Sequence, residues 1–222
     1  MSLDAPVFHG ADLADRLVWR PVDESVVVFE GMVWDVRRDT VNLGEAGKVT
    51  REYLDHPGAV AIVALRQVTG RDQVLLIQQY RHPVGAFEWE VPAGLLDVAG
   101  EPPWQAAARE LHEEADLSAR RWDVLIDHFG SPGGSSEALR VFLARDLAEV
   151  DHDERFSRDG EERGMSVCWV DLDEAHEAVL RGQLHNSSAV IGILTAHAAQ
   201  ARGWATLRPR DAPWPEHPAY RS

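Results

Sequence analysis

Two neighbouring stretches of apolar residues constrain the fold most strongly. AVAIVALR occupies residues 59–66 and follows Gly58, and QVLLIQQY occupies residues 73–80, with the turn-forming TGRD between them. A continuous apolar run of this length, without alternation, is typical of a strand that is buried on both faces of a sheet. The pair therefore predicts a central β-sheet that other elements cover on both sides.

Segments elsewhere in the chain supply these covering layers. Apolar stretches at 122–128, 138–144 and 165–170 predict further strands, and residues 171–184 and 187–203 carry apolar side chains at helical spacing. Pro102 and Pro103 predict the start of another helix, because proline is tolerated in a first turn. This order of elements predicts an α/β fold, a mixed sheet with helices on both faces.

The two ends of the chain differ from this central part. Predicted strands at 26–31, 32–43 and 49–56 are separated by turn-prone residues, which indicates an antiparallel arm or small sheet. Four prolines follow Gly203 and predict an irregular tail on the surface. We therefore expect an arm at 1–57, a main domain at 58–202 and a tail at 203–222.

Charge and composition exclude some classes of partner. The 222 residues include 37 acidic and 22 Lys and Arg residues, a formal net charge of -15, which repels the phosphates of polymeric nucleic acid. No window approaches the ~18 apolar residues of a membrane span. The single cysteine, Cys168, excludes an intrachain disulfide and lies in an apolar stretch typical of a buried strand. A cytoplasmic protein is the expectation.

The helix that begins near Pro103 carries three carboxylates on one flank. Glu110 and Glu114 are four residues apart, and Glu113 is three from Glu110, spacings at which like charges repel. One interpretation is a solvated helix face. The other is a site for a hard divalent cation, which is held by carboxylates together with substrate phosphates. An Arg109 to Glu101 pair would brace the preceding loop against the helix.

This region resembles a known family motif. GLLDVAGEPPWQAAARELHEEADL, residues 94–117, resembles the Nudix box in Glu101, Arg109-Glu110 and Glu113-Glu114. It departs from the motif in having six residues rather than five between Gly94 and Glu101, and in having Asp116 where glycine is usual. Aspartate tolerates the left-handed conformation of a helix end better than most residues do.

The resemblance narrows to the ADP-ribose pyrophosphatase branch of that family. Its similar segments occur in the same order between Val26 and Ala201: TREYLDHPGAVAIVAL, QQYRHPVG, EWEVPAGLLD, SPGGSSEALRVFLA and LRGQLHNSSAVIGIL. The resemblance implies a Nudix-type α/β/α sandwich with a mixed sheet, preceded by an N-terminal antiparallel strand arm that swaps across a homodimer. It also implies hydrolysis of ADP-ribose to AMP and ribose 5-phosphate.

The same resemblance implies roles for individual residues. Mg²⁺, with Mn²⁺ as the other possibility, would be held by the Ala93 carbonyl, Glu110, Glu113 and Glu114. Glu137 would polarise the attacking water, so the implied catalytic residues are Glu137, Glu113 and Arg109.

Contacts to the nucleoside diphosphate sugar are implied for a second group. Arg81 and Arg51 match arginines that contact phosphate or the terminal ribose, with Arg51 reaching across the dimer. Glu90 is expected to meet substrate or to structure the site, and Trp34 or Trp89 to stack on a base, although tryptophan in strands is usually core. The alternative function is a Nudix-derived sensor that binds such nucleotides without cutting them.

Overall fold

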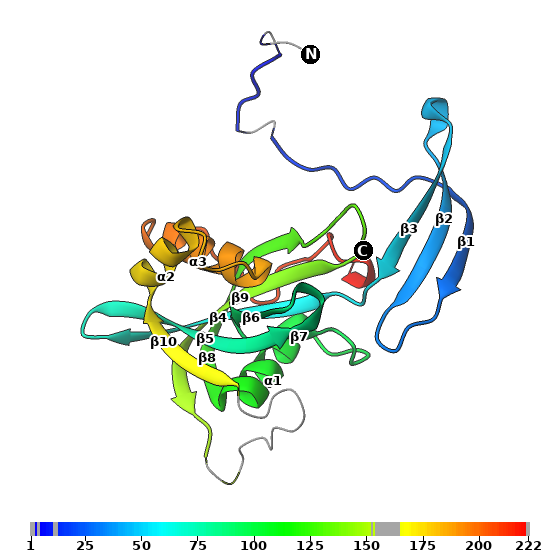
Figure 1. Cartoon of the computed structure of the whole chain (residues 1–222). Coiled ribbons are helices and arrows are strands. Elements are labelled where there is room, and N and C mark those ends of the chain that lie inside the picture. The colour runs from blue at the N-terminus through cyan, green and yellow to red at the C-terminus, as the bar shows by residue number, and fades with distance from the viewer. Residues whose placement is uncertain (1–2, 4, 11–12, 152, 154–164, 221–222) are drawn as a thin grey trace. The chain divides into compact units, whose positions relative to one another are not determined.

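The computed structural model describes residues 3, 5–10, 13–151, 153 and 165–220 (Figure 1). The chain forms two compact units, the first ending at Glu52 and the second beginning at Tyr53. None of the described helices is long and apolar enough to cross a membrane.

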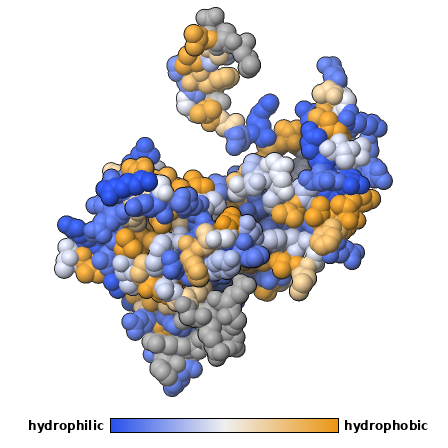
Figure 2. All heavy atoms as spheres, in the orientation of Figure 1, coloured by the Kyte–Doolittle hydropathy of each residue, from blue (hydrophilic) through white to orange (hydrophobic). Residues whose placement is uncertain are grey.

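The first unit contains a three-stranded sheet in the order β1-β2-β3. These strands are β1 (Val22–Phe29), β2 (Asp35–Asn42) and β3 (Lys48–Asp55), and the 3-10 helix η1 (Gly44–Ala46) lies between the last two. β1 is exposed along its whole length, and hydrophobic side chains gather on this sheet (Figure 2). The exposed apolar residues include Val26, Val27, Val28 and Phe29.

The second of the predicted strands begins later than expected. Residues 32–43 were predicted as one strand, but β2 starts at Asp35, so Trp34 lies in the preceding bend. The Gly31 N–H donates to Asp35 Oδ1 at 3.2 Å, a side-chain contact that closes a turn before the strand.

The second unit is built on a mixed eight-stranded sheet. Its main path is β10 (Ser166–Asp171), β5 (Arg71–Arg81), β4 (Ala59–Val68), β9 (Ala138–Glu149), β8 (Leu117–Phe129) and β11 (Arg208–Pro209). β6 (Ala86–Glu90) pairs with β5, and β7 (Ala93–Leu95) pairs with β4. β4 and β9 are parallel, and the other pairs are antiparallel. The expected mixed sheet is confirmed.

β4 separates two hydrophobic cores. Its residues Val60, Ile62 and Ala64 pack toward α1 (Pro103–Ala115), and the alternate residues Ala61 and Val63 pack toward α2 (Leu172–Leu180) and α3 (Ser187–Gln200). Figure 1 shows α1 on one face of the sheet and the other two helices on the opposite face. The prediction of strands buried on both sides is therefore confirmed, and so is the α/β/α arrangement.

Local sequence signals set the ends of the helices. α1 begins at Pro103 and ends at Ala115, and the following Asp116 caps it in the left-handed conformation with φ 52°, as expected. Asp171 and Asn186 cap α2 and α3, because each side chain accepts a hydrogen bond from a first-turn N–H. α2 stops four residues earlier than the predicted end at 184, before Gly182 with φ 67°.

The C-terminal segment lies largely on the surface, as predicted, but two of its side chains are buried. Trp214 is 2% exposed and His217 is 5% exposed, and β11 and the 3-10 helix η5 (Pro218–Tyr220) are short ordered elements within this segment. Its prolines exclude long helices, but its aromatic side chains have apolar area to bury, and they pack on one another. Trp214 and Tyr220 stack with ring centroids 5.8 Å apart.

Candidate functional site

The acidic helix α1 places its carboxylates through its packing. Ala106, Ala107 and Leu111 are fully buried against the sheet, so Glu110 and Glu114 emerge from the flank that neighbours β7. Both glutamates are partly or largely buried rather than solvated, with Glu114 only 8% exposed. This burial argues against the simple solvated face that the sequence left open.

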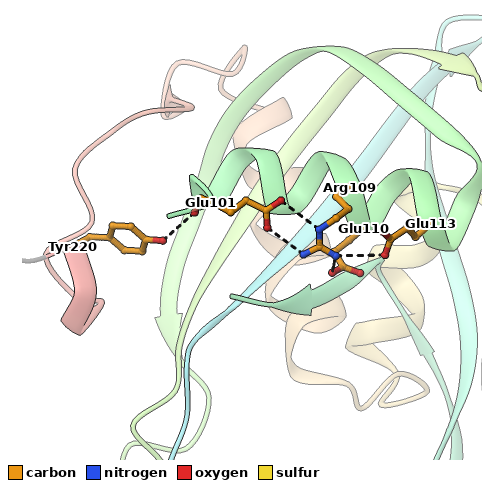
Figure 3. Close-up of polar contacts among 5 residues, drawn as sticks. All are labelled: Glu101, Arg109, Glu110, Glu113 and Tyr220. Carbon is orange, nitrogen blue, oxygen red and sulfur yellow. Dashed lines mark hydrogen bonds and ion pairs between the residues drawn. The ribbon is translucent and has the colours of Figure 1, made fainter. Parts of the chain in front are cut away.

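Arg109 joins the carboxylates of α1 to the loop before it (Figure 3). Its Nε and Nη2 atoms contact the two carboxylate oxygens of Glu101 at 3.3 and 3.2 Å, while Nη1 lies 2.6 Å from Glu110 Oε1 and 3.4 Å from Glu113 Oε2. The guanidinium therefore holds three acids at once, and the predicted brace between Arg109 and Glu101 is confirmed. Hydrogen bonding with Glu101 raises the pKa of Arg109.

The backbone of β7 forms the other side of the carboxylate cluster. The Ala93 N–H donates to Glu114 Oε2 at 3.0 Å. Gly94 lies against the Glu110 carboxyl group, and a Cβ at Gly94 would overlap it. No strand was predicted for residues 93–95, but they pair with β4, so this glycine is held in a strand where only a hydrogen side chain fits.

Glu110 has the most perturbed carboxyl group of the cluster. Burial raises its pKa to about 7, and the negative charges of Glu113 and Asp97 act in the same direction, while Arg109 opposes them. Burial and the neighbouring acids therefore disfavour the ionised form of Glu110, and a further positive charge nearby would stabilise that form.

These residues offer the oxygen donor atoms that a hard divalent cation prefers. Carboxylate and backbone carbonyl oxygens are what Mg²⁺ prefers, and Gly94 allows the Glu110 carboxyl group to approach the β7 backbone. Within the described residues, no three His, Cys, Asp or Glu side chains converge as a metal site does. Arg109 instead bridges Glu110 and Glu113.

Glu137 lies in the loop immediately before β9, as the sequence predicted. The backbone of this loop is fixed to the end of β3, since the Leu54 N–H donates to the Gly134 carbonyl and the Ser136 N–H donates to the Leu54 carbonyl, both at 3.0 Å. Gly130 packs against the carboxyl group, where an added Cβ would lie 2.6 Å from Glu137 Oε2.

His56 is a neighbour of Glu137 that sequence reasoning missed. Its Nε2 lies 3.6 Å from Glu137 Oε1, and its Nδ1 accepts a hydrogen bond from the Gly58 N–H at 3.0 Å. Burial lowers the pKa of His56, and the charge of Glu137 opposes this shift. The only sequence signal was its place in DHPG, before the central strand, where a lone histidine attracts little notice.

Half-exposed Arg81 pairs with buried Glu90 on a neighbouring strand. Arg81 Nε and Nη2 each lie 2.7 Å from one carboxylate oxygen of Glu90, which is 2% exposed. Hydrogen bonding with Glu90 raises the pKa of Arg81, and the charge of Glu114 adds to this. Arg81, which was predicted to contact substrate, is therefore in electrostatic contact with one carboxylate of α1, that of Glu114.

Three further predicted residues lie on other elements. Trp89 lies in β6 and packs against the core beneath α2 and α3. Arg51 is exposed in the first unit, where Nη1 donates to its neighbour's carbonyl, that of Thr50, at 2.9 Å. Trp34 also belongs to the first unit.

Two features together are typical of one family of proteins. They are a mixed sheet with helices on both faces, and an acidic helix that an Arg-Glu pair braces and that packs against a short strand containing glycine. The model of the NUDIX domain matches residues 55–190, and the chain belongs to the Nudix family.

Individual relatives narrow this assignment. The chain is 45% identical over 194 residues to a Mycobacterium tuberculosis protein named ADP-ribose pyrophosphatase, a match that covers 87% of this chain and 90% of that one. It is 30% identical over 166 residues to a methanol dehydrogenase activator of Bacillus methanolicus, covering 75% and 86% respectively. A solved structure titled as an ADP compounds hydrolase superposes with a TM-score of 0.68 at 18% identity, over 86% of this chain and 99% of that one, which supports the fold.

Proposed function

We propose that this protein is a Mg²⁺-dependent hydrolase of ADP-ribose or of a related nucleoside diphosphate sugar. Water would add to one phosphorus of the pyrophosphate as the bond from that phosphorus to the bridging oxygen breaks, which gives AMP and ribose 5-phosphate from ADP-ribose. One observation carries the proposal: the buried carboxylates of α1 lie against the β7 backbone in a chain closely related to an enzyme named ADP-ribose pyrophosphatase.

The acidic residues of α1 would hold the metal. Glu110, Glu113 and Glu114 supply carboxylate oxygens, and the Ala93 carbonyl would complete the set. When bound, the ion supplies positive charge to the phosphate oxygens and lowers the pKa of the attacking water. Mn²⁺ also suits oxygen ligands, so this donor set does not separate the two metals.

Other side chains would position water and substrate. Glu137 would accept the proton of the attacking water. Backbone hydrogen bonds fix its loop, and its carboxylate lies beside His56. Arg109 would keep Glu113 in place and Arg81 would meet a phosphate or the terminal ribose, with Glu90 orienting it.

The first unit would complete the enzyme in a homodimer. Its exposed apolar residues favour burial against a second copy of the chain, and Arg51 and Trp34 would then reach substrate from this arm. The acidic surface, with its net charge of -15, favours a small substrate neutralised by bound cations over polymeric nucleic acid. We assign the enzyme to the cytoplasm.

A regulator that binds nucleotides without turnover is the weaker alternative. The relative named methanol dehydrogenase activator, at 30% identity, favours it. The complete set of Arg109, Glu110, Glu113 and Glu114 favours catalysis, because a protein that only binds has no need of a buried carboxylate cluster.

Product analysis tests the proposal directly. The protein is incubated with ADP-ribose, ADP-glucose, NADH and diadenosine polyphosphates, with Mg²⁺ or with EDTA, and the products are separated by chromatography. We expect AMP and ribose 5-phosphate from ADP-ribose, formed fastest among these compounds and only with Mg²⁺. Nucleotide binding without turnover of any compound would replace the hydrolase by the regulator.

A further inference from the structure

The segment 208–220, which we name the C-terminal strap, is fixed to the sheet by a buried arginine. Arg140 is 2% exposed and donates to the carbonyls of Ala212 and Pro213 at 2.8 and 3.0 Å, while a second set of its hydrogen bonds engages Asp127. Its guanidinium also lies over the Trp214 ring, 4.6 Å from the centroid. A buried guanidinium requires such partners, so the strap is an integral part of this face of the sheet.

One part of the strap contacts the start of α1. The Arg210 guanidinium lies over the Trp104 ring, 4.1 Å from its centroid, and the Tyr220 hydroxyl donates to the Glu101 carbonyl at 3.4 Å. Figure 3 shows the chain of polar contacts that leads from Tyr220 through Glu101 to Arg109. The side chain of Glu101 binds Arg109, which in turn contacts Glu110 and Glu113.

Another part of the strap contacts the turn that carries His56. His217 Nε2 lies 2.7 Å from the Pro57 carbonyl and must donate to it, while His217 Nδ1 accepts from the Ala219 N–H at 3.1 Å. Both ring nitrogens are thus engaged by a neutral imidazole with its proton on Nε2. The ring lies against Gly58, whose φ of 90° and lack of a side chain allow this approach.

The turn leads to the proposed general base. The Gly58 N–H donates to His56 Nδ1, and His56 Nε2 faces Glu137. The strap therefore reaches the two parts of the second unit that hold the proposed functional carboxylates, the loop before α1 and the turn before β4.

We propose that the strap is a positioning element of the site, which holds the Glu101 end of α1 and the Pro57-Gly58 turn in register with each other. Tyr220 and His217 are its positioning residues, and neither touches substrate. The inference rests on the proposed function for its effect on turnover, but its effect on the loops is independent of any activity.

Hydrogen exchange of backbone amides measures the loops themselves. His217→Ala and Tyr220→Phe are compared with wild type, because each removes one strap contact. We expect His217→Ala to speed exchange about 3- to 10-fold in peptides covering 55–59, and Tyr220→Phe to speed it by a smaller factor in peptides covering 96–103, as loss of single hydrogen bonds implies. Exchange in α3 should stay unchanged in both.

Steady-state kinetics of the same variants distinguish a positioning role of the strap from a general loss of stability. We expect kcat to fall about 3- to 10-fold in His217→Ala with KM for the nucleotide within about 2-fold, because the substrate-contacting groups are intact. His217→Gln, which keeps a donor for the Pro57 carbonyl, should restore most of the rate. His185→Ala, at an exposed loop position between α2 and α3, is the matched control and should behave as wild type.

The outcomes distinguish this inference from the proposed function. Unchanged exchange at 55–59 and 96–103 overturns the positioning role, and so does altered exchange with an unchanged kcat in an active enzyme. A wild type that hydrolyses none of the compounds overturns the hydrolase instead, whatever the exchange shows. If His217→Ala does not fold, Tyr220→Phe and Arg210→Ala, which remove only a hydroxyl and a stacked guanidinium, still test the contact of the strap with the start of α1, and unchanged exchange at 96–103 then overturns the positioning role.

Discussion

Glu110 shows how a single carboxyl group in this site is set by its neighbours. Burial and two further acids favour its protonated form, while Arg109 favours its charged form. A nearby cation would tip this balance toward the charged carboxylate, so metal binding and ionisation of Glu110 are linked. The roles proposed for the other glutamates differ from this one, and kinetics can separate them.

Two isosteric substitutions distinguish a metal ligand from a general base. Glu114→Gln should raise the Mg²⁺ concentration needed for half-maximal activity at least about 10-fold, because it removes a charged ligand. Glu137→Gln should lower kcat about 100-fold or more with little effect on that concentration, because general-base catalysis is worth about 100- to 10,000-fold. Steady-state kinetics at varied Mg²⁺ measure both.

The control for this pair is Glu177→Gln, a more than half-exposed side chain on α2. It should leave both quantities unchanged. Wild-type kinetics in the Glu114 variant would remove that residue from the metal site, and an undiminished kcat in the Glu137 variant would move the general base elsewhere.

His128 predicts a pH dependence of stability. Both ring nitrogens are buried without a hydrogen-bond partner among the described residues, and burial lowers the pKa of this histidine, while Glu137 and Asp127 oppose the shift. The unfolded chain therefore binds a proton more readily than the folded protein does. Stability should fall as pH drops through about 6.5, by at most about 1.4 kcal/mol per pH unit from this group.

Chemical denaturation between pH 8 and pH 5.5 measures this effect. His128→Phe should flatten the dependence, because it removes the titrating group and keeps an aromatic ring. His185→Ala, exposed, should not change it. An equally steep loss in the phenylalanine variant would assign the dependence to other groups, His56 first, since burial also lowers its pKa.

At the scale of elements, the buried pair of Arg140 and Asp127 anchors β9, β8 and the strap together. Their side chains are 2% and 7% exposed and share two hydrogen bonds, and Arg208 adds a third contact to the same carboxylate at 2.8 Å. Burying such charges is costly, so the geometry holds only while the partners remain.

Removal of the arginine should therefore be strongly destabilising. Arg140→Ala should lower the free energy of unfolding by about 3 kcal/mol or more, because it leaves Asp127 partly uncompensated and two strap carbonyls without a donor. Arg121→Ala, whose exposed side chain pairs with Asp123, should cost less than about 1 kcal/mol. Urea denaturation compares them, and equal losses would contradict the anchoring role of Arg140.

The elements divide clearly into those that sequence predicts and those that it does not. β4 and α1 were predictable, because continuous apolar runs and the Nudix-like spacing of Glu101, Arg109 and Glu110 are local signals. Even the left-handed Asp116 followed from residue chemistry. β7 was missed because three residues with a glycine carry no strand pattern, and they become a strand only through pairing with β4.

The candidate site shows the same division. The acids of α1 and the loop position of Glu137 were expected from the motif, whereas the placement of His56 beside Glu137 depends on a contact across the fold. The surface position of the strap was predicted, but its anchoring by Arg140 was not, because that contact joins residues far apart in the sequence. The aromatic residues Trp214 and Tyr220 were the available signal that it packs.

At the scale of the whole molecule, the first unit has too little core for its apolar surface. Every residue of β1 is exposed, and Val26, Val27 and Val28 are each 40% exposed. A small sheet of three strands gains its stability from packing against something else. This is the structural argument for the proposed homodimer.

Light scattering after gel filtration tests the assembly. We expect a mass about twice the 24.7 kDa of the chain. Val27→Lys should shift the equilibrium toward the monomer, because it places a charge on the apolar sheet. Val68→Lys, at an equally exposed valine near the end of β4, is the matched control and should leave the mass unchanged. A monomeric wild type would contradict the dimer.

The strap also sets an order in time for the newly made protein. Glu101 and Tyr220 are 119 residues apart, and Pro57 and His217 are 160 apart. At about 5–20 residues per second, the ribosome needs roughly 6–24 seconds to make the 119 residues between the first pair. During that interval a nascent chain already carries its acidic helix but not the segment that contacts it, so these contacts form late in biosynthesis.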